Sequence, residues 1–302
     1  MHRIKALRND YAVFVSATGC SKMFDLITLG NLCVDVVTPV VEKLPPVEQI
    51  KTREHLTELT KQAKDTTLWE VGANCNVLIA AARLGLRPAC IGNLGDDVYG
   101  RFLVDALEAE GITRVEPLAP GAFEAELQHT LLCFVLVDQS AAHAFCSRYD
   151  FGPWPLLPGV ESLTPSALQM LRETHTLLLN GFVFDELPAR VVLEAARAAR
   201  KAGAAVFFDP GPRAWTLPPD VLKDVLDVAD VVITTQEEAL VLTGQADPQA
   251  AGWQIVHGRL GAATHTCFVK LGPSGAILCS KASGIAHWQP ALQVDVADTL
   301  QV

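Results

Sequence analysis

Short apolar runs alternate along most of the chain with stretches in which apolar residues return every three or four positions. The first apolar run, residues 24–30, is closed by Gly30, which is typical of a buried strand. Residues 73–84 carry apolar side chains at helical spacing, and Gly85 follows as a stop signal. Because strand and helix patterns continue to alternate, the sequence predicts an α/β domain with a mostly parallel sheet.

The later segments repeat this alternation, with two interruptions. Residues 39–65 are rich in proline and charge and predict either a lid or small edge sheet, or a solvated surface insertion. Residues 138–165 predict a long loop. The remaining strands are expected at 88–92, 127–137, 176–180, 205–208, 231–234, 266–270 and 276–280, and the remaining helices at 98–110, 188–202, 219–229 and 237–243.

The composition is that of a globular enzyme with a sizeable core. The chain has 302 residues, of which 50% are hydrophobic and 19% charged, and its net charge is -10. This balance argues against a nucleic-acid or anionic-membrane partner, because such partners are bound through Lys and Arg. The sequence contains no run of 18 apolar residues, so it predicts no transmembrane helix.

The cysteines and the first residues bear on the compartment. The eight cysteines form no C-x-x-C pair, so we expect reduced, buried thiols rather than a zinc site or disulfides. Residues 1–23 carry four basic side chains against one acidic side chain and predict an N-terminal extension that is either a targeting segment or disordered. The expected location is therefore cytoplasmic, or organellar if residues 1–23 are a targeting segment.

The common catalytic signatures are absent from the sequence: it has no P-loop, no metal-binding H-E-x-x-H and no G-x-S-x-G nucleophile turn. The dinucleotide turn is also missing, which counts against the alternative of a Rossmann-type oxidoreductase. The informative segment is instead residues 69–85. Gly72 lets the backbone approach a ligand, and Asn74 and Asn76 at the helix start can either cap the helix or bind hydroxyl groups.

Residues 69–100 resemble the first signature of the ribokinase-like (PfkB) carbohydrate kinases. In that family a glycine-rich turn precedes an asparagine on a helix, and two further glycines follow at set distances. Val71 departs from the pattern, because the family usually has its first glycine there, and so does Leu78, where the family prefers a small residue. The matching positions are Gly72, Asn76, Gly85 and Gly95.

Four other segments resemble family motifs in the same order, so the resemblance covers almost all of the chain from residue 24. Two of them depart from the family, because Gly211 and Thr235 each replace an asparagine. The four segments are Gly30-Asn-Leu-Cys-Val-Asp35, Asp209-Pro-Gly-Pro-Arg213, Thr235-Gln-Glu-Glu238 and Val269-Lys-Leu-Gly-Pro-Ser-Gly275.

The resemblance implies a three-layer α/β/α kinase domain over residues 24–302, with a small β lid formed by segments within 36–65 and 127–147. It implies transfer of the γ-phosphate of ATP to a hydroxyl of a sugar or nucleoside, with Mg²⁺ as the second cofactor. Glu238 would hold Mg²⁺ through water. The acceptor would be bound by Asp35, Gly72 and Asn76, and the nucleotide by Thr235, Lys270, Gly272 and Gly275.

The second signature of the family opens with Asp-Thr and continues with Gly-x-Gly-Asp, whose aspartate is the catalytic base. Asp298 and Thr299 match the opening, but Leu300-Gln301-Val302 follow. We therefore expect no catalytic residue in these 302 residues and no kinase activity from them alone. A non-catalytic sugar-binding or regulatory protein is the alternative. Lid strands often pair between subunits in this family, which makes a homodimer through the lid a further expectation. The sequence does not identify the acceptor.

Overall fold

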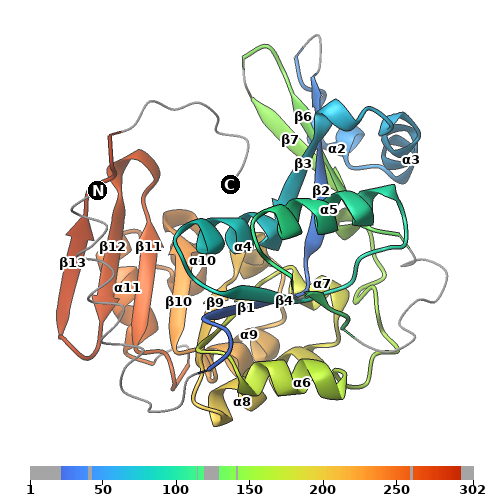
Figure 1. Cartoon of the computed structure of the whole chain (residues 1–302). Helices are drawn as coiled ribbons and strands as arrows, with labels where there is room; N and C mark the ends of the chain where they lie inside the picture. Colours follow the sequence, from blue (N-terminus) through green and yellow to red (C-terminus); the bar gives the residue numbers. More distant parts are fainter. Residues whose placement is uncertain are drawn as a thin grey trace.

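The computed structural model describes residues 22–39, 43–113, 115–118, 129–140, 142–258 and 261–293. Within them, the largest element is a nine-stranded sheet with the order β13-β12-β11-β10-β9-β8-β1-β4-β5, in which only β12 and β13 run antiparallel to their neighbours (Figure 1). Its strands are β1 (Leu26–Leu29), β4 (Pro88–Ile91), β5 (Val115–Glu116), β8 (Thr176–Asn180), β9 (Ala205–Asp209), β10 (Val231–Thr235), β11 (Thr266–Lys270), β12 (Ala276–Ser280) and β13 (Ile285–Gln289).

Helices cover both faces of this sheet. The chain moves from β1 to β4 in one direction along the sheet and from β8 to β11 in the other. Since parallel crossovers are right-handed, α4 and α8 lie on opposite faces, which confirms the predicted three-layer α/β/α fold. The helices are α4 (Asn74–Arg83), α5 (Val98–Ala109), α6 (Pro165–Arg172), α7 (Val183–Glu186), α8 (Ala189–Lys201), α9 (Pro219–Leu226), α10 (Gln236–Thr243) and α11 (Pro248–Val256).

A second, four-stranded sheet has the order β3-β2-β6-β7. Figure 1 shows it standing above the nine-stranded sheet, with two further helices beside it. The β2–β6 pair is parallel and the other two pairs are antiparallel. The elements of this part are β2 (Leu32–Pro39), β3 (Trp69–Ala73), β6 (Leu131–Val137), β7 (His143–Ser147), α2 (Val47–Ile50) and α3 (Arg53–Gln62).

The alternation of β2 decides which of its side chains face the core. Val34 and Val36 are 0% and 1% exposed and pack in a cluster with Trp69, Leu78 and residues of α5. Because successive strand residues point to opposite faces, Asp35 projects from the other face of the sheet. One face of the second sheet is therefore buried against α4, and the Asp35 carboxyl group lies on the opposite, open face of that sheet.

Several expected elements differ from those observed. Residues 138–165 are not one long loop, because they contain β7 and the 3₁₀ turn η2 (Arg148–Asp150). Among the described residues of the interval 36–65, only the end of β2 is strand, and the other regular elements are the helices α2 and α3. Local signals were present for α3, since the Thr52 hydroxyl accepts a hydrogen bond from His55 N at 3.1 Å, as an N-cap does. Helices α6 and α11 and strand β13 were not expected at all.

No helix among the described residues is long and apolar enough to cross a membrane. The N-terminal extension up to residue 21 and the Asp298-Thr299 pair lie outside the described residues.

Candidate functional site

The strand order places a candidate site at the carboxyl ends of β1 and β8. These strands are neighbours, but the chain leaves them in opposite directions along the sheet. Ligands of open α/β sheets bind at such a switch point, because the connections on either side diverge and leave room. Gly30 and Asn31 follow β1, and Gly181 follows β8.

Asn74 ties these strand ends together. Its side-chain amide donates hydrogen bonds to the carbonyl oxygens of Gly30, at 2.7 Å, and Leu29, at 3.4 Å. Its Oδ1 accepts a hydrogen bond from the Asn180 amide at 2.9 Å. Asn74 does not cap the helix, because α4 has no side-chain capping hydrogen bond; its side chain is 2% exposed and bonds to the strand ends instead. Asn180 Oδ1 is buried and has no hydrogen-bond partner among the described residues.

Asp35 and Gly72 are brought into direct contact by the pairing of β2 with β3. A Cβ atom on Gly72 would lie 2.6 Å from Asp35 Cγ and 2.6 Å from Cys33 Sγ, and would overlap Asp35 Oδ1. The Cys33 thiol donates a hydrogen bond to Asp35 Oδ1 at 3.4 Å. Only glycine leaves space for both side chains over β3. Asp35 lies inside a strand, not in the turn after the first strand, because Gly30 and Asn31, with φ of 65° and 53°, start a new strand.

The electrostatic setting of Asp35 is unusual for a carboxyl group. Burial raises the pKa of Asp35 to about 6; the hydrogen bond from Cys33 opposes this rise, and the Glu70 carboxylate opposite it on β3 adds to it. A perturbed carboxyl group on an open sheet face is a candidate ligand-binding group. Asn76 lies in the first turn of α4 and is half-buried. Its place in the same cavity as Asp35 stays a prediction.

A half-buried glutamate connects the two sheets, and sequence reasoning missed it. Glu186 Oε1 accepts hydrogen bonds from Asn31 N, at 2.9 Å, and from the Tyr149 hydroxyl. Burial raises the pKa of Glu186 to about 7, while the bonds from Tyr149 and Asn31 oppose the rise and Asp185 adds to it. Tyr149 follows β7, and Asn31 joins β1 to β2, so one carboxyl group touches two of the connections between the sheets. The only sequence signal was its position shortly after β8.

The Asp209–Arg213 segment packs directly on the end of β8. A Cβ atom on Gly181 would lie 2.7 Å from Arg213 Cβ and would overlap the Pro210 carbonyl oxygen. The Arg213 guanidinium lies 2.9 Å from Asp185 Oδ2 and over the ring of Phe182, 5.3 Å from its centre. Burial raises the pKa of Asp185 to about 6, and the Arg213 charge opposes the rise. This family-like motif therefore forms part of the floor beside the switch point.

Further along the same edge, the residues expected at the nucleotide come together. Thr235 pairs with Lys270 in the β10–β11 register. Lys270 Nζ lies 3.0 Å from Asp209 Oδ2. Thr235 N donates to Glu238 Oε2 at 2.7 Å, and Glu238 N donates to the Thr235 hydroxyl at 3.2 Å, which forms a capping box. Burial raises the pKa of Glu238, with Asp209 adding to the rise and Thr235 and Lys270 opposing it.

The two glycines of the following turn differ. Gly272, at φ 55°, has no atom within 4 Å of the position of a Cβ, so its backbone is open on that side. Gly275, at φ 97°, faces the chain after β13: a Cβ would lie 2.7 Å from Ala291 N and overlap the Gln289 carbonyl oxygen. A packing requirement is therefore sufficient to explain glycine at 275, whatever its role toward a nucleotide.

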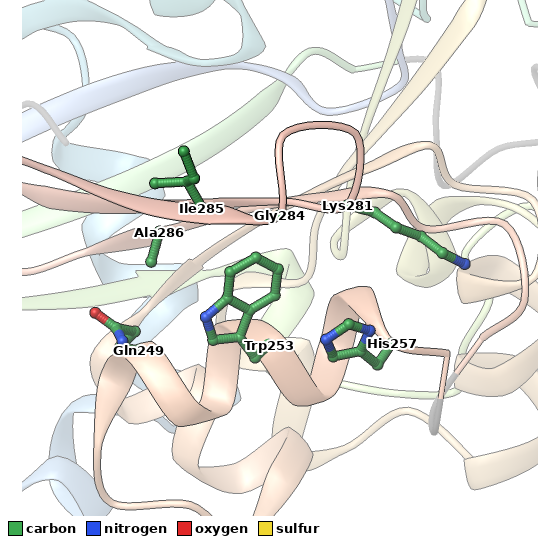
Figure 2. Close-up of a pocket in the computed structure, with 7 residues that line it drawn as sticks. All are labelled: Gln249, Trp253, His257, Lys281, Gly284, Ile285 and Ala286. Carbon is green, nitrogen blue, oxygen red and sulfur yellow. The ribbon is translucent and has the colours of Figure 1, made fainter.

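A pocket of about 520 Å³ lies between α11 and the β12–β13 turn (Figure 2). Trp253 and His257 stack in it with ring centres 5.3 Å apart, and Lys281 lines it from the turn. Ser280, which precedes the turn, pairs with Thr266 at the amino end of β11. The pocket is thus at the opposite edge of the sheet from the switch point and from Lys270. It is a separate surface feature.

Comparison with known proteins identifies the family. The family model described as "pfkB family carbohydrate kinase" matches residues 47–300, and the chain therefore belongs to this family. The 5-dehydro-2-deoxygluconokinase of Halalkalibacterium halodurans is 26% identical over 231 residues, which cover 74% of this chain and 62% of the relative. That of Listeria monocytogenes is 26% identical over 239 residues, covering 74% and 64%. The chain thus spans about three fifths of the length of the curated relatives it matches.

Solved structures of ribokinase-like enzymes share the fold. The ribokinase of Arabidopsis thaliana, complexed with ribose and ATP, aligns with a TM-score of 0.64 at 20% identity and covers 88% of this chain and 78% of that one. The adenosine kinase of Sinorhizobium meliloti aligns with a TM-score of 0.68 at 17% identity, covering 91% and 82%. The three-layer architecture is therefore ribokinase-like, as the sequence predicted.

Proposed function

We propose that this chain carries the acceptor and nucleotide sites of an ATP-dependent kinase that phosphorylates a hydroxyl group of a sugar or nucleoside. The observation that supports this most directly is the Asp35 carboxylate lying over Gly72 on the open face of the second sheet. A carboxylate accepts hydrogen bonds from two neighbouring hydroxyl groups, which is the recognition that a polyhydroxylated acceptor needs. In this arrangement Asp35 and Asn76 orient the acceptor, and Gly72 leaves room for it.

The nucleotide belongs at the other end of the same edge. Lys270 supplies positive charge, Thr235 lies beside it, and the turn containing Gly272 and Gly275 offers backbone groups to the phosphates and ribose. The described residues contain no cluster of three His, Cys, Asp or Glu side chains able to hold a metal ion. This fits Mg²⁺ bound mainly by phosphate oxygens and water, with Glu238 as a partner through water. The bound Mg²⁺–ATP would supply the phosphoryl group.

The second sheet fits the role of a lid over the acceptor. It carries Asp35 on its open face and joins the main sheet through Gly30 and Asn31 on one side and Ala73 on the other. The segments within 36–65 and 127–147 supply the end of β2, α2, α3, β6 and β7 to this part, while β3 and the start of β2 lie outside them. Such a lid excludes water while the phosphoryl group is transferred.

Binding experiments test this function most directly. The purified chain is titrated calorimetrically with 5-dehydro-2-deoxygluconate, ribose, fructose and adenosine, because the relatives and structural neighbours are named for such acceptors. We expect at least one acceptor to bind, and Asp35→Asn to weaken it about tenfold or more through loss of charge-assisted hydrogen bonds.

Asp105→Asn, on the exposed face of α5, is the matched control and should leave the acceptor affinity unchanged. An acceptor that binds equally well to the wild type and to Asp35→Asn would contradict the proposed site. An acceptor that binds at Asp35 in a protein that does not bind ATP would favour the sugar-binding alternative.

A further inference from the structure

The residue two positions before Asp35 shares its face of the strand. Side chains at i and i+2 of a strand project to the same side, so Cys33 lies next to Asp35 on β2. Cys33 is nevertheless 3% exposed, whereas Asp35 is partly exposed. The thiol therefore lies in the wall beneath the carboxyl group, not at the surface.

The distances show that this thiol and the carboxyl group are in direct contact. Cys33 Sγ is 3.4 Å from Asp35 Oδ1, and its S–H donates the hydrogen bond between them. The absent Cβ of Gly72 would lie 2.6 Å from both Cys33 Sγ and Asp35 Cγ, so the two side chains occupy adjoining places over one glycine. Within the described part of the chain, no other hydrogen bond to Asp35 is observed. Oδ2 is therefore the oxygen left for a ligand.

Among the described residues, the other titratable groups near Asp35 donate no hydrogen bond to it. Glu70, opposite on β3, is a carboxylate and only repels it. The thiols of Cys75 on α4 and Cys133 on β6 lie near it as well, and burial raises the pKa of both. Burial also raises the pKa of Cys33, so its thiol stays protonated and keeps its S–H at neutral pH.

We propose that Cys33 is a positioning residue for the acceptor: its thiol holds Oδ1 of Asp35, turns Oδ2 toward the acceptor hydroxyls and favours the ionised carboxylate. This inference rests on the proposed function, because it assigns Asp35 to the acceptor. It adds a second residue to that site, one that touches no substrate and acts only through Asp35. A thiol is a weak donor, so it offsets only part of the rise in the pKa of Asp35 that burial causes.

The test uses two substitutions with opposite expected effects. Cys33→Ser replaces S–H by a stronger O–H donor of similar size, and Cys33→Ala removes the donor. The protonation midpoint of Asp35 is followed by carboxyl ¹³C NMR in the free protein. We expect it to fall in Cys33→Ser and to rise in Cys33→Ala, by about half a pH unit or more in each case. Movement of both midpoints in the same direction, or no movement, would overturn the proposal.

Cys146→Ser is the matched control, because Cys146 is a fully buried thiol of the same sheet that pairs with Phe134 on the opposite face from Asp35. It should leave the Asp35 midpoint unchanged. The pH at which acceptor affinity falls to half should follow the carboxyl midpoint in each variant. Failure of the wild type to bind any acceptor would count against the proposed function alone, because the NMR titration still measures whether Cys33 controls Asp35.

Discussion

At the scale of single residues, two side chains share one space above Gly72. The Cys33 thiol and the Asp35 carboxyl both approach the α-carbon of Gly72 more closely than any Cβ would allow. The requirement for glycine is therefore steric and comes from the neighbouring strand, since no positive φ is recorded for Gly72. An acceptor bound by Asp35 would lie against a bare stretch of backbone.

Gly72→Ala should disrupt acceptor binding more than it disrupts the fold. The added methyl group must push Asp35 and Cys33 aside, and overpacking of this kind costs about 1–3 kcal/mol of stability. We expect acceptor affinity to fall at least about tenfold, because Asp35 no longer points along its original direction. Thermal unfolding and acceptor titration measure the two effects separately.

Gly159→Ala is the control for this substitution. Gly159 has no atom within 4 Å of its Cβ position and no positive φ is recorded for it. Gly159→Ala should change the free energy of unfolding by less than about 0.5 kcal/mol and leave the acceptor affinity unchanged. If Gly72→Ala binds the acceptor as tightly as the wild type, Asp35 is not held where the acceptor binds.

At the scale of elements, hydrophobic spacing predicted the strands of the main sheet better than it predicted the strands of the second sheet and some of the helices. The strands at 176–180 and 266–270 have the expected limits, because each is a short apolar run between turn residues. Helix α11 was missed although Asp247 caps it and Pro248 follows, since its apolar spacing is weak. Strand β7 was missed because its pattern carries exposed residues on an edge strand, where burial imposes little regularity.

The candidate site could be predicted only where its residues lie within recognisable motifs. Asp35, Gly72, Thr235 and Lys270 were found in this way, and the structure shows which of them are neighbours. Glu186 and Cys33 could not be found, because their importance comes from partners that are distant in the chain or on an adjacent strand. Residue type and spacing alone could not separate Asn74 from Asn76; the family motif selected Asn76, and the structure distinguishes Asn74 by its contacts with the strand ends.

Glu186 of α7 should make the stability of the protein depend on pH. Its pKa is about 7 in the folded protein against an ordinary value of 4.5, so the folded state favours the protonated form. Its contribution is fully present below about pH 4.5 and is lost as the pH rises through about 7. Asp35 and Asp185, with pKa values of about 6, act in the same direction. A comparison with Glu186→Gln therefore isolates its share.

We expect the free energy of unfolding to fall less with pH in Glu186→Gln than in the wild type. The difference between the two proteins should change by about 2–3 kcal/mol between pH 4.5 and pH 8, at about 1.4 kcal/mol for each unit of pKa shift. Urea unfolding at a series of pH values measures it. Glu194→Gln, on the exposed side of α8, should follow the wild-type curve. Parallel curves for the wild type and Glu186→Gln would show that Glu186 is not buried against Tyr149 and Asn31.

At the scale of the whole molecule, the candidate groups follow one edge of the main sheet. The carboxyl ends of β1, β8, β9, β10 and β11 lie in that order, from the junction with the second sheet toward Lys270 (Figure 1). An acceptor at Asp35 and a nucleotide at Lys270 would therefore approach each other above the ends of β8 and β9. The Asn180 amide, with its unpartnered oxygen, and Asp209, paired with Lys270, lie at these ends.

The second sheet is attached to the main sheet at a few defined points. Gly30, Asn31 and Ala73 cross between the sheets with positive φ, and Asn74 and Glu186 brace these crossings by hydrogen bonds. Few backbone pairs join the two sheets, because each forms a separate hydrogen-bonded ladder. The second sheet also packs on α4 and α5 through its buried face, so its opening must break these contacts, and a ligand between the sheets would oppose that opening further.

Hydrogen exchange should show this coupling. At an acceptor concentration about 100 times Kd, we expect amide exchange in β2, β3 and β6 to slow by up to about 100-fold, because opening must then release the acceptor. Amides of α11 and β13, at the far side of the main sheet, serve as the control. Those that exchange through local opening, and not through global unfolding, should exchange at unchanged rates. Asp35→Asn, with an affinity about tenfold lower, should show protection reduced to about tenfold or less at the same acceptor concentration. Protection confined to β10 and β11, with no change in β2 and β3, would show that the acceptor binds away from the second sheet and that this sheet is not its lid.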